Sequence, residues 1–125
     1  MFTEKNPINW FEIPATDLER AKTFYEHIFS IAMTTTDLGT LKMAWFPGIP
    51  EGSGATGTLV QAEAYIPSYQ GSMVYFGVDD IPAVLKKVEE KGGKVLNEKM
   101  SIGEYGFVAH FEDSEGNRVA LHSQF

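Results

Sequence analysis

A strand followed at once by a helix is predicted by residues 11–25, which read FEIPATDLERAKTFY. Pro14 ends the strand because proline has no N–H to donate to a neighbouring strand. Thr16 and Glu19 then match the S/T-x-x-E capping box, a signature of a helix N-terminus. Apolar residues recur beyond it at helical spacing, at Leu18, Ala21, Tyr25 and Ile28. The helix is therefore amphipathic, and its apolar face must pack on a sheet.

The same order of elements is predicted a second time further along the chain. Strands are expected at 31–36, 41–46 and 55–61, then a connector at 63–71, then a strand at 73–78. A second helix is expected from Asp80 and Pro82, with Gly92 and Gly93 as its stop signal. Three more strands are expected at 94–98, 107–111 and 118–123.

Both halves thus have the order strand, helix, strand, strand, strand. Phe11 and Phe76 lie the same number of residues apart as Trp45 and His110, which supports an internal repeat. We predict an α+β fold of two βαβββ modules whose curved mixed sheets enclose a cleft. The single domain of residues 1–125 would hold module 1 at about 7–62, a connector at about 63–71 and module 2 at about 72–123. An α+β sandwich without internal symmetry is the alternative.

Length and composition limit the function classes. The chain has 125 residues, a common size for one domain, and 43% hydrophobic residues, enough for a core. A net charge of −7 opposes binding to nucleic acid. The absence of cysteine excludes disulfides and thiolate metal sites. No apolar run is long enough to span a membrane, and residues 1–7 lack the apolar stretch of a signal peptide, so a cytoplasmic location is expected.

Alternation along three strands assigns side chains to faces. Phe11, Phe76 and Leu121 belong to apolar sets that should face the helices, so the residues beside them should face the other way. The residues expected on that second face are Trp10, Glu12, Met73, Tyr75 and His122. Such a mixture of apolar and polar side chains is typical of a small-molecule site. We therefore predict that Glu12, Tyr75 and His122 point into one cavity lined by Trp10 and Met73.

Three segments carry a resemblance to a known family: residues 11–25, VDDI at 78–81 and FEDSEGN at 111–117. They resemble the vicinal oxygen chelate superfamily, which includes glyoxalase I, extradiol dioxygenases and bleomycin- and fosfomycin-resistance proteins. The resemblance covers residues 7–123 and is nearest to a glyoxalase-related branch of undefined activity.

Metal-dependent members, by this resemblance, take one ligand each from the first, fourth, fifth and eighth strands. Three of these positions fall on Trp10, Met73 and Ala120, and the fourth lies within 55–61, which has no His, Asp or Glu. Divalent ions need imidazole or anionic oxygen donors, so we expect no metal, no cofactor, and neither glyoxalase I nor extradiol dioxygenase activity. A displaced site of Glu12, His122 and Tyr75 is the alternative, although two or three donors are few for a retained metal.

A metal-free site gives these residues other roles. Glu12 would act as base or anchor, His122 as proton carrier and Tyr75 as hydroxyl donor. Trp10, Met73 and Trp45 would bind the substrate. The alternatives are that Glu12 and His122 form a structural pair and that the tryptophans fill the core. For His110 a surface or interface role is expected.

Three functions follow from these roles. The first is a metal-independent lyase or isomerase acting on a small metabolite through Glu12 and His122. The second is a binding or sequestering protein of the bleomycin-resistance type, and the third is a non-catalytic interaction domain. Proximity of Glu12 to His122 would favour the enzyme, and separation would disfavour it. A homodimer is expected because four-stranded modules leave uncovered sheet edges.

Overall fold

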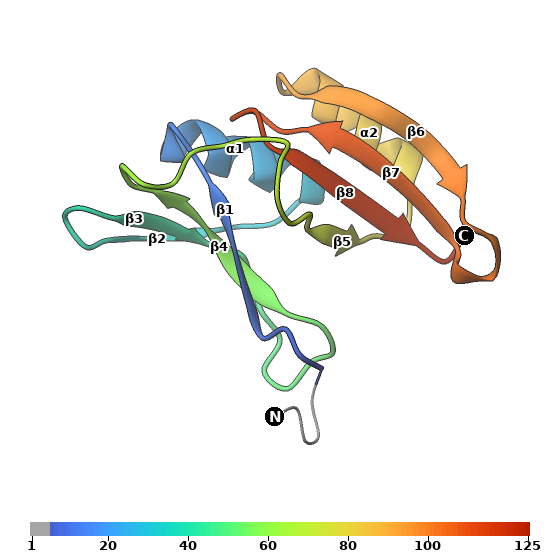
Figure 1. Ribbon diagram of the computed structural model, residues 1–125, viewed down its shortest axis with the longest axis horizontal. Coiled ribbons are helices and arrows are strands. Elements are labelled where there is room, and N and C mark those ends of the chain that lie inside the picture. Colours follow the sequence, from blue (N-terminus) through green and yellow to red (C-terminus); the bar gives the residue numbers. More distant parts are fainter. Residues whose placement is uncertain (1–5) are drawn as a thin grey trace.

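The computed structural model describes residues 6–125 and contains two sheets and two long helices (Figure 1). Residues 1–5, which hold most of the stretch used to argue against a signal peptide, lie outside the described residues. The elements are β1 (Trp10–Pro14), α1 (Leu18–Phe29), β2 (Thr34–Asp37), β3 (Lys42–Trp45), β4 (Thr56–Gln61), β5 (Tyr75–Gly77), α2 (Ile81–Glu90), β6 (Lys94–Ser101), the 3₁₀ turn η1 (Gly103–Tyr105), β7 (Phe107–Glu112) and β8 (Arg118–Ser123). The predicted α+β fold of two βαβββ modules is confirmed.

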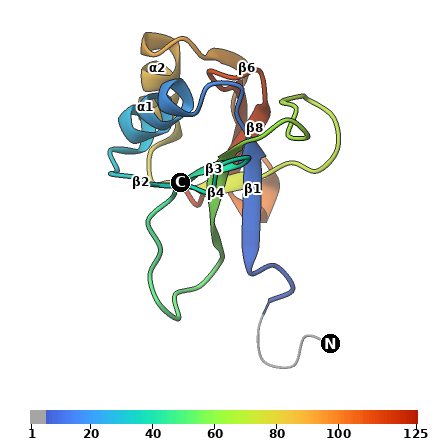
Figure 2. The same cartoon turned by 90° about the vertical axis from the view of Figure 1, so that its left-hand side faces the viewer.

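Each module forms one four-stranded mixed sheet, with the orders β1-β4-β3-β2 and β5-β8-β7-β6. The first strand of each module pairs in parallel with the last, and the other pairs are antiparallel. Helices α1 and α2 lie side by side on one side of the sheets (Figure 2). On the opposite faces of the sheets, residues 6–125 place neither α1 nor α2. No helix in the described part of the chain is long and apolar enough to cross a membrane.

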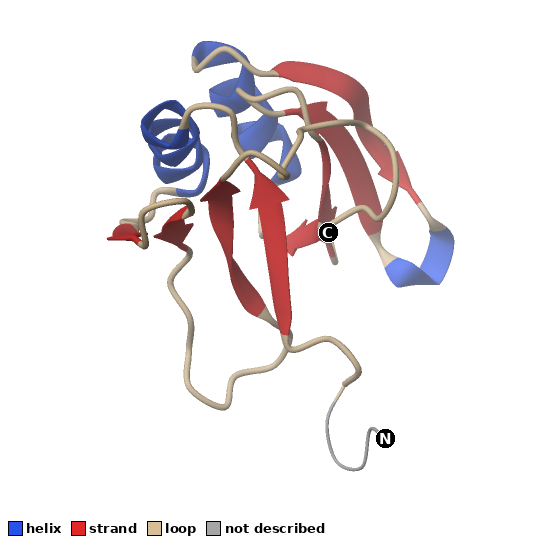
Figure 3. Ribbon diagram, turned by 60° about the vertical axis from the view of Figure 1, so that its left-hand side comes forward, coloured by secondary structure: helices blue, strands red, loops and turns tan. Residues whose placement is uncertain are grey.

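Several elements differ in detail from expectation, and β2 begins only at Thr34. The fifth strand is only Tyr75–Gly77, and the sixth extends to Ser101 with irregular pairing to β7. The turn η1 closes the hairpin of β6 and β7 (Figure 3). Helix α1 is capped by Asp17, whose side chain accepts a hydrogen bond from Arg20 N, so the expected capping box of Thr16 and Glu19 is wrong.

The two modules share one aromatic core. Phe76 of β5 lies 5.5 Å from Phe11 and 5.3 Å from Phe46, measured between ring centroids, and 4.7 Å from Phe29 of α1. All three partners belong to the first module. The apolar faces of α1 and α2 complete the core with Phe24, Tyr25, Ile28, Ile81, Leu85 and Val88. The open faces are thus held in a fixed relation by shared packing.

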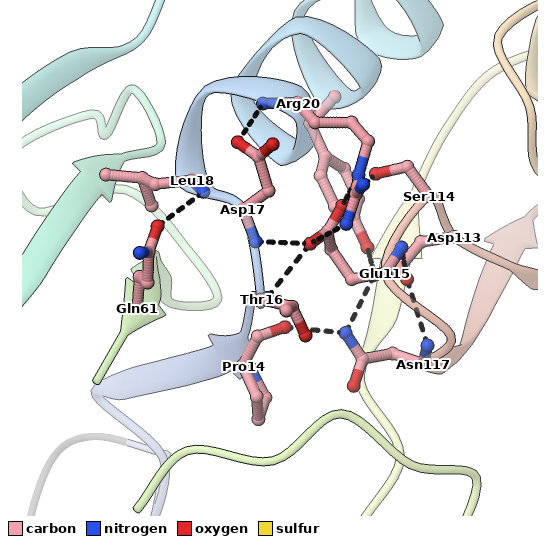
Figure 4. Close-up of polar contacts among 11 residues, drawn as sticks. Pro14, Thr16, Asp17, Leu18, Arg20, Gln61, Asp113, Ser114, Glu115 and Asn117 are labelled. Carbon is pink, nitrogen blue, oxygen red and sulfur yellow. Dashed lines mark hydrogen bonds and ion pairs between the residues drawn. The ribbon is translucent and has the colours of Figure 1, made fainter. Parts of the chain in front are cut away.

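A second link joins the turn before β8 to the start of α1 (Figure 4). The carboxylate of Glu115 is fully buried and accepts hydrogen bonds from Thr16 N at 2.9 Å and Asp17 N at 2.7 Å. Arg20 donates to the same carboxylate from Nε at 2.7 Å and Nη2 at 3.0 Å. Glu115 therefore satisfies backbone donors at the N-terminus of a helix from the other module, where a negative charge is also favoured.

Asp113 anchors the same turn from inside the protein. Its side chain accepts hydrogen bonds from the buried Tyr25 hydroxyl at 2.7 Å and from Asn117 N at 2.9 Å. The Asn117 amide in turn donates to the carbonyl of Pro14 at 2.7 Å. The DSEGN turn thus locks module 2 onto β1 and α1.

Candidate functional site

A hollow of about 560 Å³ lies on the helix-free face of the second sheet. We call it the β5–β8 hollow. Its lining residues are Tyr75, Gly77, Met100, Ile102, Val108, His110 and His122. The volume falls in the usual range for small-molecule sites, and the mixture of apolar side chains with a few polar groups is typical of them.

Strand register arranges the lining in two adjacent rows. Gly77, His122 and Val108 lie side by side across β5, β8 and β7, and Met100 of β6 continues this row. In the next row Tyr75 and His110 flank Ala120. Because Ala120 is small, the two larger side chains can meet above it.

Tyr75 and His110 do meet. Their rings stand edge to face with centroids 6.0 Å apart, and Tyr75 Oη lies 3.4 Å from His110 Nε2. The other ring nitrogen, Nδ1, lies 3.1 Å from Arg118 Nε and 2.7 Å from Arg118 Nη2. Burial lowers the pKa of His110 below its usual 6.5, and the Arg118 charge lowers it further. Both effects favour the neutral form of the His110 ring.

His122 is held by the turn before β7. Its Nε2 lies 2.6 Å from the carbonyl oxygen of Tyr105, which can only accept, so Nε2 carries the proton. The turn approaches β8 so closely that a Cβ at Gly106 would collide with the carbonyl oxygen of Ser123. Gly106 also has a φ of 104°, which favours glycine. The turn thereby fixes the His122 ring at the edge of the hollow.

Glu12 lies elsewhere. It belongs to β1 of the first sheet, where register places it beside Thr58. Its carboxylate accepts a hydrogen bond from the Tyr65 hydroxyl at 2.7 Å, and this bond raises the pKa of Tyr65 above 10.0. Glu12 lines a separate hollow of about 210 Å³. The expectation that Glu12 shares one cavity with Tyr75 and His122 is wrong, since alternation fixes the face of a residue and not its neighbours.

The remaining expected residues lie outside the β5–β8 hollow too. Trp10 and Trp45 stand edge to face on the first sheet, with ring centroids 5.2 Å apart. Trp45 is 37% exposed and donates from Nε1 to Thr36 Oγ1 at 3.1 Å. Met73 precedes β5, is half-buried and is absent from the lining of the hollow. Among the expected site residues, the structure brings only Tyr75 and His122 to this hollow.

Sequence reasoning missed His110, which lines the hollow, and Arg118, which contacts His110 and itself lines the hollow of Glu12. The expected surface or interface role of His110 is incomplete, because the side chain lines the hollow. The alternation of side chains along a strand could have identified the position of His110. Its neighbours Ala109 and Phe111 are fully buried in the core, so His110 must face the other way. Arg118 lies on the same face because Val119 and Leu121 belong to the core.

The residues present do not fit the metal of the resemblance. The positions expected to hold ligands are Trp10, Met73 and Ala120, which have no donor for a hard or borderline ion, and β4 contains no His, Asp or Glu. Among residues 6–125 no three His, Asp or Glu side chains are grouped so that they could hold a metal ion. We derive no step through a metal.

Comparison with known proteins assigns the family. Residues 7–121 match the family model of the Glyoxalase/Bleomycin resistance protein/Dioxygenase superfamily. The chain belongs to this superfamily. A glyoxylase-like domain-containing protein of Didymella fabae is 35% identical over 118 residues, which cover 91% of each chain.

Solved structures show the same fold at lower identity. The E144Q mutant of maize glyoxalase I superposes with a TM-score of 0.72 and 23% identity, over 94% of this chain and 47% of the maize chain. The antibiotic binding protein TnmS3 of Streptomyces sp. CB03234 superposes with a TM-score of 0.70 and 22% identity, over 97% and 98% of the two chains. This chain thus spans about half the length of the maize enzyme and nearly all of TnmS3.

Proposed function

We propose that this protein binds a small organic molecule in the β5–β8 hollow. The observation that carries the proposal is that Tyr75 and His110 meet in a hollow that also contains His122 and exposed apolar side chains. Met100 is 51% exposed and Ile102 37% exposed, so apolar surface is available to a ligand. TnmS3, which shares the fold over nearly its whole length, is described as an antibiotic binding protein.

Binding without chemistry is favoured over a lyase or isomerase that uses Glu12 and His122. Proton transfer between two groups requires both within reach of one substrate. Glu12 is engaged by Tyr65 and lines another hollow, whereas His122 is held by the Tyr105 carbonyl. The proposed site residues are therefore Tyr75, His110 and His122, with Met100 and Ile102 as the apolar wall.

A thermal-shift screen of small aromatic and carbonyl compounds tests this proposal. We expect compounds that raise the melting temperature equally with and without added nickel or zinc, because ligands that bind the native state stabilise it by mass action. The glutathione hemithioacetal should not be turned over, since Trp10, Met73 and Ala120 cannot chelate a metal. Stabilisation or turnover that depends on added metal would contradict the proposal.

We also propose that the protein is a homodimer in solution. Each sheet has two edge strands, β1 and β2 in the first and β5 and β6 in the second, and edge strands present unpaired backbone groups. A two-fold arrangement would cover such edges with the fewest distinct contacts. Sedimentation equilibrium should give twice the mass of the 13.9 kDa chain. A mass of one chain throughout the accessible concentration range would contradict the dimer.

A further inference from the structure

A hydrogen-bond chain with a fixed direction runs along the wall of the hollow. It begins at Arg118, whose guanidinium has five N–H donors and no acceptor. Two of its nitrogens contact Nδ1 of His110, at 3.1 and 2.7 Å. Nδ1 must therefore accept, which leaves the single proton of the neutral imidazole on Nε2.

The second step passes from His110 to Tyr75. Nε2 of His110 lies 3.4 Å from the Tyr75 hydroxyl oxygen, and because Nε2 carries the proton it is the donor. A hydroxyl can accept one hydrogen bond while donating another. The Tyr75 proton is thus free to point away from His110. Tyr75 is 51% exposed and lines the hollow, so a ligand can reach this proton.

We propose that Arg118 and His110 orient the Tyr75 hydroxyl as a donor, so that the hollow selects an apolar compound with an acceptor oxygen such as a carbonyl. This inference rests on the proposed function of the hollow. Tyr75 would contact the ligand, whereas Arg118 is a positioning residue that acts through His110. The wall formed by Met100, Ile102 and Val108 would receive the apolar part of the ligand. The positive charge of Arg118 further favours an acceptor over a cation.

The lowered pKa of His110 agrees with this direction, because burial and, to a smaller extent, the Arg118 guanidinium oppose a second proton on the ring. The register partners of His110 are Ala120 on β8 and Asn97 on β6, neither of which carries a charge. Glu112, next along β7 on the same face, accepts a hydrogen bond from Tyr69. Among the described residues the His110 ring bonds to Tyr75 and Arg118, and the histidine that pairs with a carboxylate is His27, with Glu90.

A first experiment needs no ligand. Long-range ¹⁵N–¹H spectra of the whole protein report which imidazole nitrogen carries the proton. We expect His110 as the neutral Nε2–H form at pH 7, with a midpoint below 6.5. Arg118→Leu should mix the two tautomers and raise the midpoint, and Arg118→Lys, which keeps a charged donor, should restore the preference in part. An Nδ1–H form, or a protonated ring at pH 7, would overturn the hydrogen-bond chain.

A second experiment uses two probes of nearly equal shape, acetophenone with a carbonyl oxygen and α-methylstyrene with a methylene group in its place. Titrations followed at the backbone amides of the hollow should show acetophenone binding about three- to tenfold more tightly, the effect of one hydrogen bond. Tyr75→Phe should abolish this preference and leave α-methylstyrene binding unchanged. Arg118→Leu should reduce the preference for acetophenone over α-methylstyrene.

The possible outcomes distinguish a failure of this inference from a failure of the proposed function. Equal affinity of the two probes for the wild-type protein would overturn the inference while the proposed function stands. Binding of neither probe would count against the proposed function itself and against the selection of an acceptor oxygen with it. Loss of both affinities in Tyr75→Phe with an unchanged fold would assign Tyr75 a packing role and overturn its role as donor.

Discussion

Replacing Glu115 by Ala is expected to lower the free energy of unfolding by about 2–4 kcal/mol. The carboxylate is fully buried and accepts hydrogen bonds from Thr16 N, Asp17 N and Arg20. The substitution leaves two backbone donors at the start of α1 without their acceptor and separates the two modules at this point. Urea unfolding followed by circular dichroism measures the change.

Glu19→Ala is the matched control, because Glu19 is an exposed acidic residue in the first turn of the same helix. Its effect should stay within about 0.5 kcal/mol. Equal unfolding midpoints for Glu115→Ala and the wild-type protein would show that the contacts of Glu115 do not hold the modules together.

The Glu115 contribution should depend on pH in a defined direction. Desolvation acts to raise the pKa of Glu115, but hydrogen bonds from Arg20, Asp17 N and Ser114 together outweigh it and lower the pKa below 4.5. A group with a lower pKa in the native state stabilises it above its unfolded pKa and loses that contribution as pH falls through the native pKa. The stability difference between wild type and Glu115→Gln should therefore shrink below pH 4.5.

Replacing Gly77 by Leu is expected to weaken probe binding by about tenfold or more while the fold remains intact. Gly77 lines the hollow, and a Cβ there would meet no atom within 4 Å. The added side chain therefore enters the space beside His122, its register partner. Glycine also weakens a strand interior, so the free energy of unfolding should be unchanged or slightly higher.

Thr35→Leu is the control for this substitution, because Thr35 is exposed on β2 of the other sheet and away from the hollow. Acetophenone titrations of the two variants, with melting temperatures, give the comparison. Undiminished affinity in Gly77→Leu would show that the probe binds elsewhere.

The spacing of apolar residues predicted the fold well because it depends only on neighbouring residues in the same helix or strand. The apolar sets of β1, β5 and β8 identified the helix-facing sides, and the open-face position of Tyr75 and His122 followed. The helix start shows where local signals fail: Thr16 and Glu19 match a capping box, yet Glu115 takes the Thr16 N–H from 99 residues away. No short window of sequence contains that partner.

The site was predicted only in part for a similar reason. Alternation gives the face of Glu12 and His122, but the pairing of strands decides their neighbours. Glu12 is paired with Thr58, and His122 with Gly77 and Val108. The same alternation would have predicted the face of His110, because both residues beside it are buried in the core.

The location of a bound probe distinguishes the β5–β8 hollow from every other surface of the protein. Intermolecular nuclear Overhauser effects between acetophenone and the methyl groups of the protein identify the side chains in contact. We expect contacts to the methyls of Met100, Ile102 and Val108, which line the β5–β8 hollow. Contacts instead to the methyls of Ile66, which lines the hollow of Glu12, would place the ligand outside the β5–β8 hollow and contradict the proposed site.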